Sequence, residues 1–228
     1  LLRLDRPGEA LDELRNVAGS DELTNESLTV RMLQGNALVR MGDLEGGLAI
    51  LQAAKAGACE ASPVVRSEIA LGIALAYFGR RDLQMALLEL SDVAPTSDIV
   101  HARAYEYRGW IASARAEYER AIAMFQAALR RLQSCCERDR YLEANCLQAL
   151  AYLAVERFDR ATWALVAEHR SGINWTAQGL AYPRFLIAIC AANFAYDVDG
   201  DALAAATEAR FAEAIAPSDA YRAQALCM

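Results

Sequence analysis

The stretch ARAYEYRGWIASARAEYERAIAMFQAA, residues 102–128, alternates small and bulky side chains at fixed spacings. Small Gly109 is followed by bulky Tyr118, small Ala121, bulky Phe125 and small Ala128. Small side chains let two helix backbones approach closely, and bulky side chains three or four positions away fill the space toward a neighbouring element. This spacing, which we call the ladder, predicts a pair of packed antiparallel helices.

The ladder recurs along most of the chain. Its second small position falls on Ala10, Gly47, Ala86, Ala121, Ala161 and Ala205, which are 37, 39, 35, 40 and 44 residues apart. A recurring interval of this size indicates stacked helical hairpins, because no single hairpin can bury its apolar face alone. Glycine inside a helix is costly, so Gly47 indicates a place where two helices touch. The ladder weakens at Glu168, Asn193 and Ala202, where a small, a small and a bulky residue are expected.

Turn and capping residues divide the chain into expected helices. Gly42-Asp43 ends one helix, and Ser62 with Pro63 begins another. Pro183 indicates either a late helix start or a kink. We expect a first helix that follows the turn at residues 5–8 and is broken by Gly19-Ser20-Asp21. Further helices are expected over about residues 22–41, 44–56, 63–78, 82–93, 141–155, 158–169, 177–196 and 202–214, with the hairpin of residues 102–128 extending to about 133 and a last helix beginning near 216.

The composition is that of a globular helical protein. Hydrophobic residues make up 55% and charged residues 23% of the 228 residues, with only 5 prolines. The net charge of −7 excludes a broad electrostatic field for nucleic acid. Lys55 is the only lysine, which favours a GC-rich bacterial genome as the cause of the arginine excess.

The six cysteines form no CxxC pair and, with two histidines, no zinc spacing. Most lie among apolar neighbours, so we expect reduced structural thiols and a cytoplasmic location. The adjacent Cys135-Cys136 pair lies in a polar connector, where a redox role is the alternative. No secretory signal or membrane-spanning run is found in the sequence. We expect one domain over residues 1–228, as a piece of a longer protein, because the ladder begins in mid-repeat.

On these residues the chain resembles the tetratricopeptide-repeat superfamily over nearly its whole length. The best matches are Gly109/Tyr118/Ala121/Phe125/Ala128 and Ala74/Tyr77/Leu83/Ala86/Leu90. The resemblance implies an all-α fold, a right-handed superhelix of about five to six antiparallel helical hairpins with the first and last incomplete. The irregular repeat length is similar to repeats in large bacterial signalling ATPases and LuxR-type transcriptional regulators of the MalT kind. Such a segment would be a sensor or scaffold in signal transduction, since no Walker loop or DNA-binding helix-turn-helix is present.

The resemblance also implies which residues face the inner groove. Carried over by register, the groove residues are Met32, Asn36, Val39, Leu71, Leu75, Phe78, Glu106, Trp110, Ser113, Cys146, Leu150 and Leu153. This face is mostly apolar, which argues against a clamp for peptide carboxylates and favours an amphipathic helix, a hydrophobic ligand or a neighbouring segment of the same protein. The alternative is that these residues are ordinary core, since apolar stripes at helical spacing usually are.

Other candidate residues favour structural roles. His101 lies in a first helical turn without a catalytic partner, and His169 suits a helix C-terminus. The run Asp197–Asp201 with Glu208 partly fits a calcium loop, but position six is Ala202 where glycine is needed. Among the tryptophans, Trp163 fits packing, Trp175 fits a helix-flanking loop, and Trp110 is our candidate for ligand contact.

The expected function is therefore binding rather than catalysis. No nucleophile–base pair, metal cluster or phosphate loop is present, so no enzyme, metal or cofactor is predicted. The leading hypothesis is a scaffold for a protein or peptide partner or a small effector, without direct nucleic-acid or membrane contact. The alternative is an oligomerisation module that assembles subunits through its end hairpins.

Overall fold

All regular structure in the described part of the chain is helical, which confirms the all-α prediction. The structure, a computed structural model, describes residues 7–17, 24–94, 97–135, 138–176, 180–218 and 222. Eleven helices lie in these ranges: α1 (Pro7–Val17), α2 (Asn25–Arg40), α3 (Leu44–Gly57), α4 (Pro63–Gly79), α5 (Leu83–Ser91), α6 (Asp98–Ala114), α7 (Tyr118–Ser134), α8 (Arg140–Arg157), α9 (Arg160–Ser171), α10 (Ala181–Asp197) and α11 (Ala202–Ile215).

Five short turns join the helices into antiparallel hairpins. In each turn a residue with positive φ precedes an acidic helix N-cap, in the pairs Gly42-Asp43, Arg81-Asp82, Ala116-Glu117, Phe158-Asp159 and Gly200-Asp201. The acidic residue's backbone N–H reaches back to the preceding helix, as from Asp43 to the Leu38 carbonyl at 3.0 Å. The Asp43 side chain also accepts the Gly46 N–H at 2.9 Å. The same residue thus closes one helix and opens the next.

The ladder is confirmed in hairpins α2–α3, α4–α5 and α6–α7, where Gly47, Ala86 and Ala121 are buried. A Cβ atom on Gly47 would lie 2.8 Å from the backbone oxygen of Gly35, so α2 and α3 touch backbone to backbone. A Cβ atom on Gly109 would lie 2.8 Å from the ring of Phe125. The small residues are therefore steric requirements of these crossings.

In hairpin α8–α9 the ladder prediction is wrong. Phe158 is the left-handed C-cap of α8 and is 61% exposed, rather than the first buried residue of α9. Ala161 is exposed as well, and Thr162 and Val166 occupy the buried positions instead. In the three earlier hairpins, the turn residue with positive φ comes seven positions after the first small residue of the ladder. In α8–α9 it comes nine positions after Ala149, so α9 begins later and its register is displaced from the ladder.

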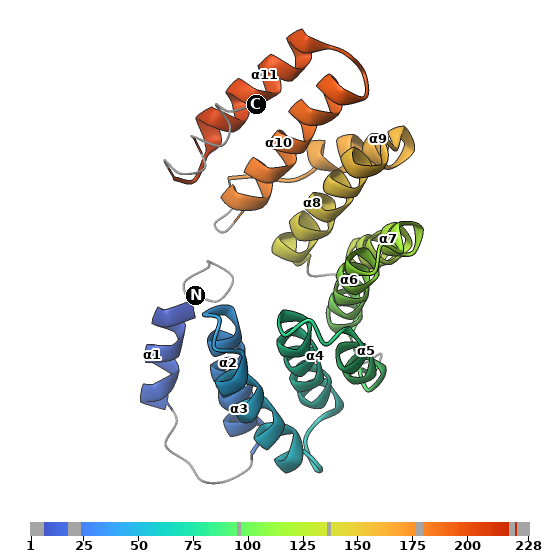
Figure 1. Ribbon diagram of the computed structural model, residues 1–228. Helices are drawn as coiled ribbons and strands as arrows, with labels where there is room; N and C mark the ends of the chain where they lie inside the picture. Colours follow the sequence, from blue (N-terminus) through green and yellow to red (C-terminus); the bar gives the residue numbers. More distant parts are fainter. Residues whose placement is uncertain are drawn as a thin grey trace.

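The hairpins follow one another along an open curve (Figure 1). The first helices α2, α4, α6, α8 and α10 lie toward the inside of the curve, with the second helix of each hairpin outside them (Figure 1). The α1–α2 end and α10 face each other across the opening. Four clusters of buried side chains run along the stack, and the largest joins α6, α7 and α8 around Phe125 and Leu147.

Most expected boundaries lie within a few residues of the observed helices. Ser62 caps α4 by accepting the Val65 N–H at 3.3 Å, and Pro63 is the first helical residue, as predicted. Pro183 lies in the first turn of α10, so it marks a late start and not a kink. The helix expected beyond residue 216 falls mostly outside the described residues.

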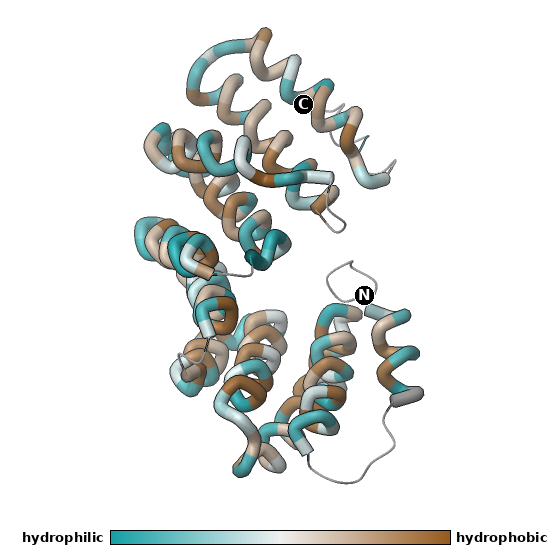
Figure 2. Tube along the Cα trace, turned by 180° about the vertical axis from the view of Figure 1, so that it is seen from behind, coloured by the Kyte–Doolittle hydropathy of each residue, from teal (hydrophilic) through white to brown (hydrophobic). Residues whose placement is uncertain are grey.

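None of the described helices combines the length and the hydrophobicity needed to cross a membrane. Hydrophilic residues interrupt the hydrophobic ones along the tube (Figure 2). This mixture of hydrophobic and hydrophilic residues along the chain is typical of amphipathic helices that pack on one side.

Candidate functional site

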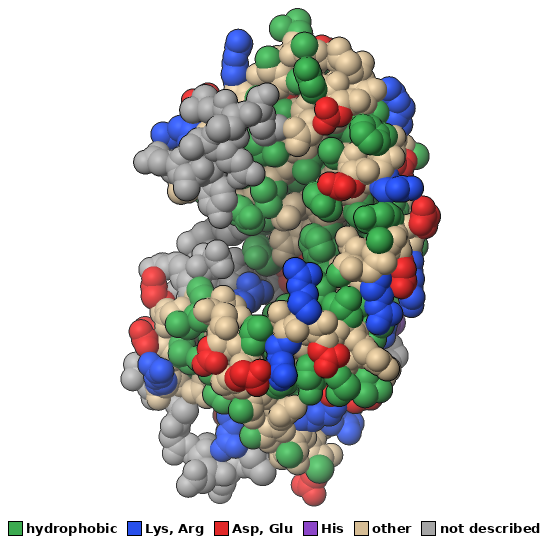
Figure 3. Space-filling model, viewed as in Figure 1, with side chains coloured by type: hydrophobic (Ala, Val, Ile, Leu, Met, Phe, Trp, Pro, Cys, Tyr) green, Lys and Arg blue, Asp and Glu red, His purple; other side chains and the backbone are tan. Residues whose placement is uncertain are grey.

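The inner side of the curve encloses a cavity of about 650 Å³. Its walls come from α2, α4, α6 and the first turns of α8, so four successive hairpins contribute their first helices. The space-filling view shows the corresponding hollow with hydrophobic and basic side chains beside it (Figure 3). A cavity of this size matches those that hold small ligands or a short peptide segment.

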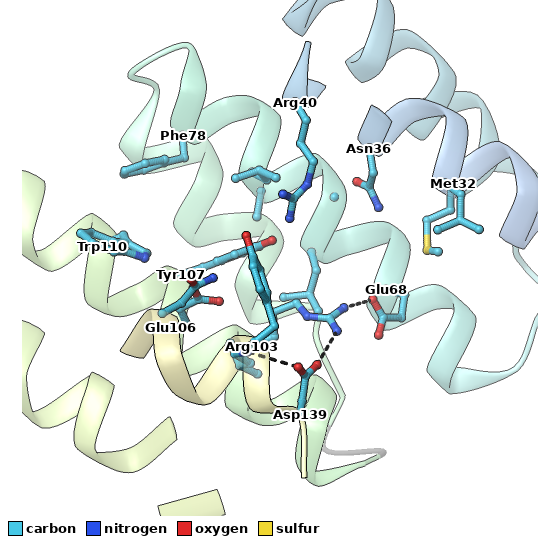
Figure 4. A pocket seen from close by; sticks show the side chains of 18 of the residues that line it. Met32, Asn36, Arg40, Glu68, Phe78, Arg103, Glu106, Tyr107, Trp110 and Asp139 are labelled. Atoms are coloured by element: carbon cyan, nitrogen blue, oxygen red, sulfur yellow. Dashed lines mark hydrogen bonds and ion pairs between the residues drawn. The ribbon is translucent and has the colours of Figure 1, made fainter. Parts of the chain in front are cut away.

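Seven of the twelve candidate groove residues line this cavity. They are Met32, Asn36, Leu71, Leu75, Phe78, Glu106 and Trp110. Those labelled in Figure 4 come from α2, α4 and α6 and point toward a common space. The structure brings these seven residues to one cavity, and whether they bind a ligand stays a prediction.

The remaining five candidates do not line the cavity. Val39 is buried in the cluster of α2, α3 and α4, where its side chain faces Gly47 of α3. Cys146, Leu150 and Leu153 are fully buried in the cluster around α8, so for them the core alternative is correct. Ser113 is half-buried near the end of α6, beyond the cavity wall. The correction has a physical reason: α8 packs against α7, α9 and α10, and these contacts cover the stripe that would otherwise face the groove.

Ion pairs cross the cavity wall. The Arg103 guanidinium lies 2.6 Å from Glu68 of α4 and 4.0 Å from Asp139, the N-cap of α8 (Figure 4). Asp139 also accepts the Leu142 N–H at 3.1 Å. Arg103 therefore ties three successive hairpins together, with its own charge compensated by two carboxylates.

Glu106 is a buried carboxyl group beside this network, with 6% of its surface exposed. Burial raises its pKa to about 7, although Arg103, the hydrogen bond from Trp110 and Arg40 act in the opposite direction. Burial likewise raises the pKa of Tyr107 to about 12. Near neutral pH the cavity wall thus contains a carboxyl group that is poised between its charged and neutral forms.

Two further polar groups on α2 face the cavity without close partners among the described residues. The Oδ1 atom of Asn36 is buried and has no hydrogen-bond donor there. Arg40 forms no ion pair within the described ranges, and its guanidinium points from α2 toward the centre of the cavity (Figure 4). A ligand in this space would meet both a hydrogen-bond acceptor and a cation.

The expectation of a mostly apolar inner face is therefore only half correct. Sequence reasoning missed the polar lining residues Arg40, Glu68, Arg103, Tyr107, Asp139, Tyr141 and Asn145. Helical spacing could have found most of them. Arg40 follows Asn36 by four positions, and Glu68 and Arg103 precede Leu71 and Glu106 by three, so extending each stripe by one turn includes them.

The other candidates have structural partners. Glu208 of the supposed calcium loop pairs with Arg170 at 2.9 Å, and Asp201 caps α11. No cluster of three potential metal ligands occurs in the described residues. His101 stacks on Tyr105, and the His169 ring contacts Gln133 and the Leu165 carbonyl.

The aromatic and thiol candidates also have structural surroundings, with one exception. Trp163 stacks on Phe194, and Trp175 donates a hydrogen bond from Nε1 to the Arg170 carbonyl. Burial raises the pKa of the Cys190 thiol to about 12, as expected of a structural cysteine. Cys59 is exposed, contrary to the general expectation, and Cys136 lies outside the described residues, so the redox alternative for its pair stays open.

No family model matches this chain, and no curated protein is similar to it in sequence. The chain is similar to a solved structure, the crystal structure of BtubC (BKLC) from P. vanneervenii, with a TM-score of 0.68 and 18% sequence identity. The match covers 93% of this chain and 89% of that chain. At this identity the likeness is one of fold, an all-helical arrangement that extends along nearly the whole of both chains.

Proposed function

We propose that the chain is a non-enzymatic binding scaffold whose inner cavity receives a peptide segment or a small effector. The observation that carries the proposal is the convergence of side chains from four successive hairpins on one cavity of about 650 Å³, which the unpaired Asn36 oxygen and the Arg40 guanidinium of α2 also face. Concave, mostly apolar sites with a few convergent polar groups are typical of ligand-binding pockets.

The same proposal includes the finer architecture and setting. The hairpins would form a right-handed superhelix of the tetratricopeptide-repeat kind, with the first helices lining the inner face. We place the protein in the bacterial cytoplasm, as the sensor or scaffold segment of a regulator. Support comes from the ladder in α2–α7, the arginine-rich composition and the absence of a disulfide among the described cysteines.

Peptide selection from a random display library tests the proposal. Peptides are selected on the wild-type chain, and their affinities are measured for the wild type and for the double variant Phe78→Ala/Trp110→Ala. We expect at least a tenfold loss of affinity, because large aromatic side chains dominate binding in such sites. Peptides that bind both proteins equally would show that the cavity is not the binding site.

A control separates binding from folding. Trp110 packs edge-on against the buried ring of Phe125 with centroids 5.2 Å apart, so its removal also loosens the core. The helical circular-dichroism signal of the double variant must match the wild type. Arg40→Glu is a second variant that reverses a charge at an exposed position and leaves the core intact. It should change the affinity of charged peptides without changing stability.

A second candidate is oligomerisation through the end hairpins. It is favoured by α11, on which Leu203 and Phe211 are eight residues apart and are 79% and 42% exposed. Eight residues make about 2.2 helical turns, so the two side chains are about 80° apart around α11, with Phe211 on the side of Arg184 of α10. Light scattering of the wild type and of Leu203→Glu/Phe211→Glu tests this candidate. A monomer at high concentration in the wild type would contradict it.

A further inference from the structure

The Glu106 end of the cavity combines a buried carboxyl group with aromatic side chains. Glu106 and Trp110 are one helical turn apart on α6, and the Trp110 indole donates a hydrogen bond to the carboxyl group. Phe78 of α4 and Tyr107 of α6 lie around the same space (Figure 4). A carboxylate can accept about four hydrogen bonds, so acceptor positions of Glu106 remain to be filled.

The charges around the cavity are also unequal. Arg103 is compensated by Glu68 and Asp139, and Arg40 is the other arginine on the wall. Two arginines thus face three carboxyl groups among the described lining residues. The buried oxygen of Asn36 adds another acceptor that lacks a donor. When Glu106 is ionised, the lining residues therefore carry one more negative than positive charge, and the Asn36 oxygen lacks a donor.

We infer that the cavity binds a cation on an apolar stem, an ammonium or guanidinium group that contacts Glu106 between Trp110 and Phe78. Aromatic faces attract cations, and a carboxylate gives such a group a charge-assisted hydrogen bond. The stem would lie against Leu71 and Leu75 of α4. This inference rests on the proposed function, because it specifies the ligand of the same cavity.

Binding of such a cation should depend on pH. Since the pKa of Glu106 is about 7, the carboxyl group is mostly ionised at pH 8 and mostly protonated at pH 5.5. A cation favours the ionised form, so binding should release a proton and weaken by up to about thirtyfold at the lower pH. The titratable and charged groups around Glu106 are Arg40 from α2, Glu68 from α4, Arg103 and Tyr107 from α6, and Asp139 and Cys146 from the α8 segment.

Three matched six-carbon probes test the inference on the full chain: n-hexylammonium, n-hexanol and hexanoate. The readout is the indole N–H resonance of Trp110 in two-dimensional NMR, assigned by its loss in Trp110→Phe. We expect saturable binding of n-hexylammonium at pH 8, and weaker binding of the alcohol and the carboxylate. The Trp110 resonance should also titrate with a midpoint near pH 7 in the free protein, and this midpoint should fall when n-hexylammonium is present.

Two variants should change n-hexylammonium binding in opposite directions. Glu106→Gln should weaken it by about tenfold or more at pH 8 and remove its pH dependence, because a neutral amide replaces the carboxylate. Arg40→Gln should strengthen it, because a competing cation is removed. Glu119→Gln, at an exposed position on α7, is the matched control and should leave binding unchanged.

A peptide arm identifies the source of the cation. N-acetyl-Leu-Lys-Leu-amide is compared with the same peptide carrying norleucine in place of lysine. Tighter binding of the lysine peptide than of n-hexylammonium identifies a peptide side chain, and equal binding identifies a free amine. Either outcome supports the cation when the lysine peptide also binds more tightly than the norleucine peptide, and equal binding of these two peptides would contradict it.

Two results would overturn the inference. One is equal or tighter binding of hexanoate or hexanol, and the other is ammonium binding that Glu106→Gln leaves unchanged. In either case the scaffold function stands as long as library-selected peptides still lose affinity on Phe78→Ala/Trp110→Ala. If these peptides bind the double variant as tightly as the wild type, the proposed function itself is contradicted.

Discussion

Hairpins α2–α3 and α8–α9 have the same kind of turn but differ in how their helices cross. The fifth residue after the positive-φ position is Gly47 in α3, Ala86 in α5 and Ala121 in α7, but Trp163 in α9. At Gly47 two backbones touch, whereas Trp163 extends to Phe194 of α10 with ring centroids 4.9 Å apart. The turn therefore shows where a hairpin lies. The size of the fifth residue after the positive-φ position decides whether the two helices of the hairpin touch each other or whether this side chain packs against the next hairpin.

The largest expected effect compares two leucines that the ladder aligns in sequence but that the displaced register of α9 puts in different surroundings. Leu51 is fully buried against Gly35 and Gly72, whereas Leu165 is only partly buried against the α8 cluster. Leu51→Ala should destabilise the chain by about 2–5 kcal/mol, and Leu165→Ala by less than half of that. Urea unfolding followed by circular dichroism measures both. Equal losses would mean that the two hairpins pack alike.

The second prediction compares a carboxyl group inside the curve with one outside it. Because the pKa of Glu106 is raised in the folded state, the unfolded chain releases this proton at lower pH than the folded chain. The contribution of Glu106 to stability therefore falls as pH rises from about 4.5 to about 7, by about 3 kcal/mol in total.

Glu106→Gln should remove this loss, so the stability of the variant relative to the wild type should increase as pH rises. Glu168→Gln, at an exposed position on α9, is the control and should keep the wild-type dependence. Urea unfolding between pH 5 and pH 8 gives the difference curves. If the difference in unfolding free energy between the wild type and Glu106→Gln did not change with pH, the raised pKa of Glu106 would be wrong.

The third prediction concerns the backbone contact itself. A Cβ atom at position 47 would lie 2.6 Å from a Val39 methyl group and 2.8 Å from the Gly35 oxygen, and a backbone atom cannot move aside cheaply. Gly47→Ala should cost about 1–3 kcal/mol despite the better helix propensity of alanine. Gly8 in α1 has nothing within 4 Å, so Gly8→Ala should be neutral or stabilising. A stabilising Gly47→Ala would show that α2 and α3 do not touch there.

The smallest expected effect is at the turns. Phe158 has φ 53° and is exposed, so Phe158→Gly should relieve backbone strain and stabilise the chain by about 1 kcal/mol. Gly42 has φ 90°, so Gly42→Ala should cost a similar amount. Thermal unfolding of the two single variants measures the pair. The turns would not be equivalent if both changes shifted stability in the same direction.

Much of the fold could be predicted from the sequence because small residues at helix crossings leave a periodic signal. Local steric rules correctly predict the helix contacts at Gly47 and between Gly109 and Phe125, and capping rules correctly predict the helix start at Ser62-Pro63. The register of α9 was missed because Ala149, Phe158 and Ala161 imitate the ladder, while the true marker was the acidic N-cap Asp159.

The candidate site was predictable in its position but not in its chemistry. Met32, Phe78 and Trp110 reach the cavity because helical register fixes the side on which they lie. The charged lining depends on contacts between hairpins, such as Arg103 with Glu68, which are 35 residues apart in sequence. Burial likewise depends on contacts between hairpins. Cys146 and Leu150 follow the correct stripe, and only the packing of α8 against its neighbouring helices hides them.

Hydrogen exchange measured by mass spectrometry, with and without a library-selected peptide, tests most directly whether the inner cavity is the binding site. We expect added protection in residues 25–40, 63–79 and 98–114, which form α2, α4 and α6, and no change in α9 or α11. Protection should disappear in Phe78→Ala/Trp110→Ala. Protection confined to residues 202–215 would contradict the assignment and place binding on the end hairpin instead.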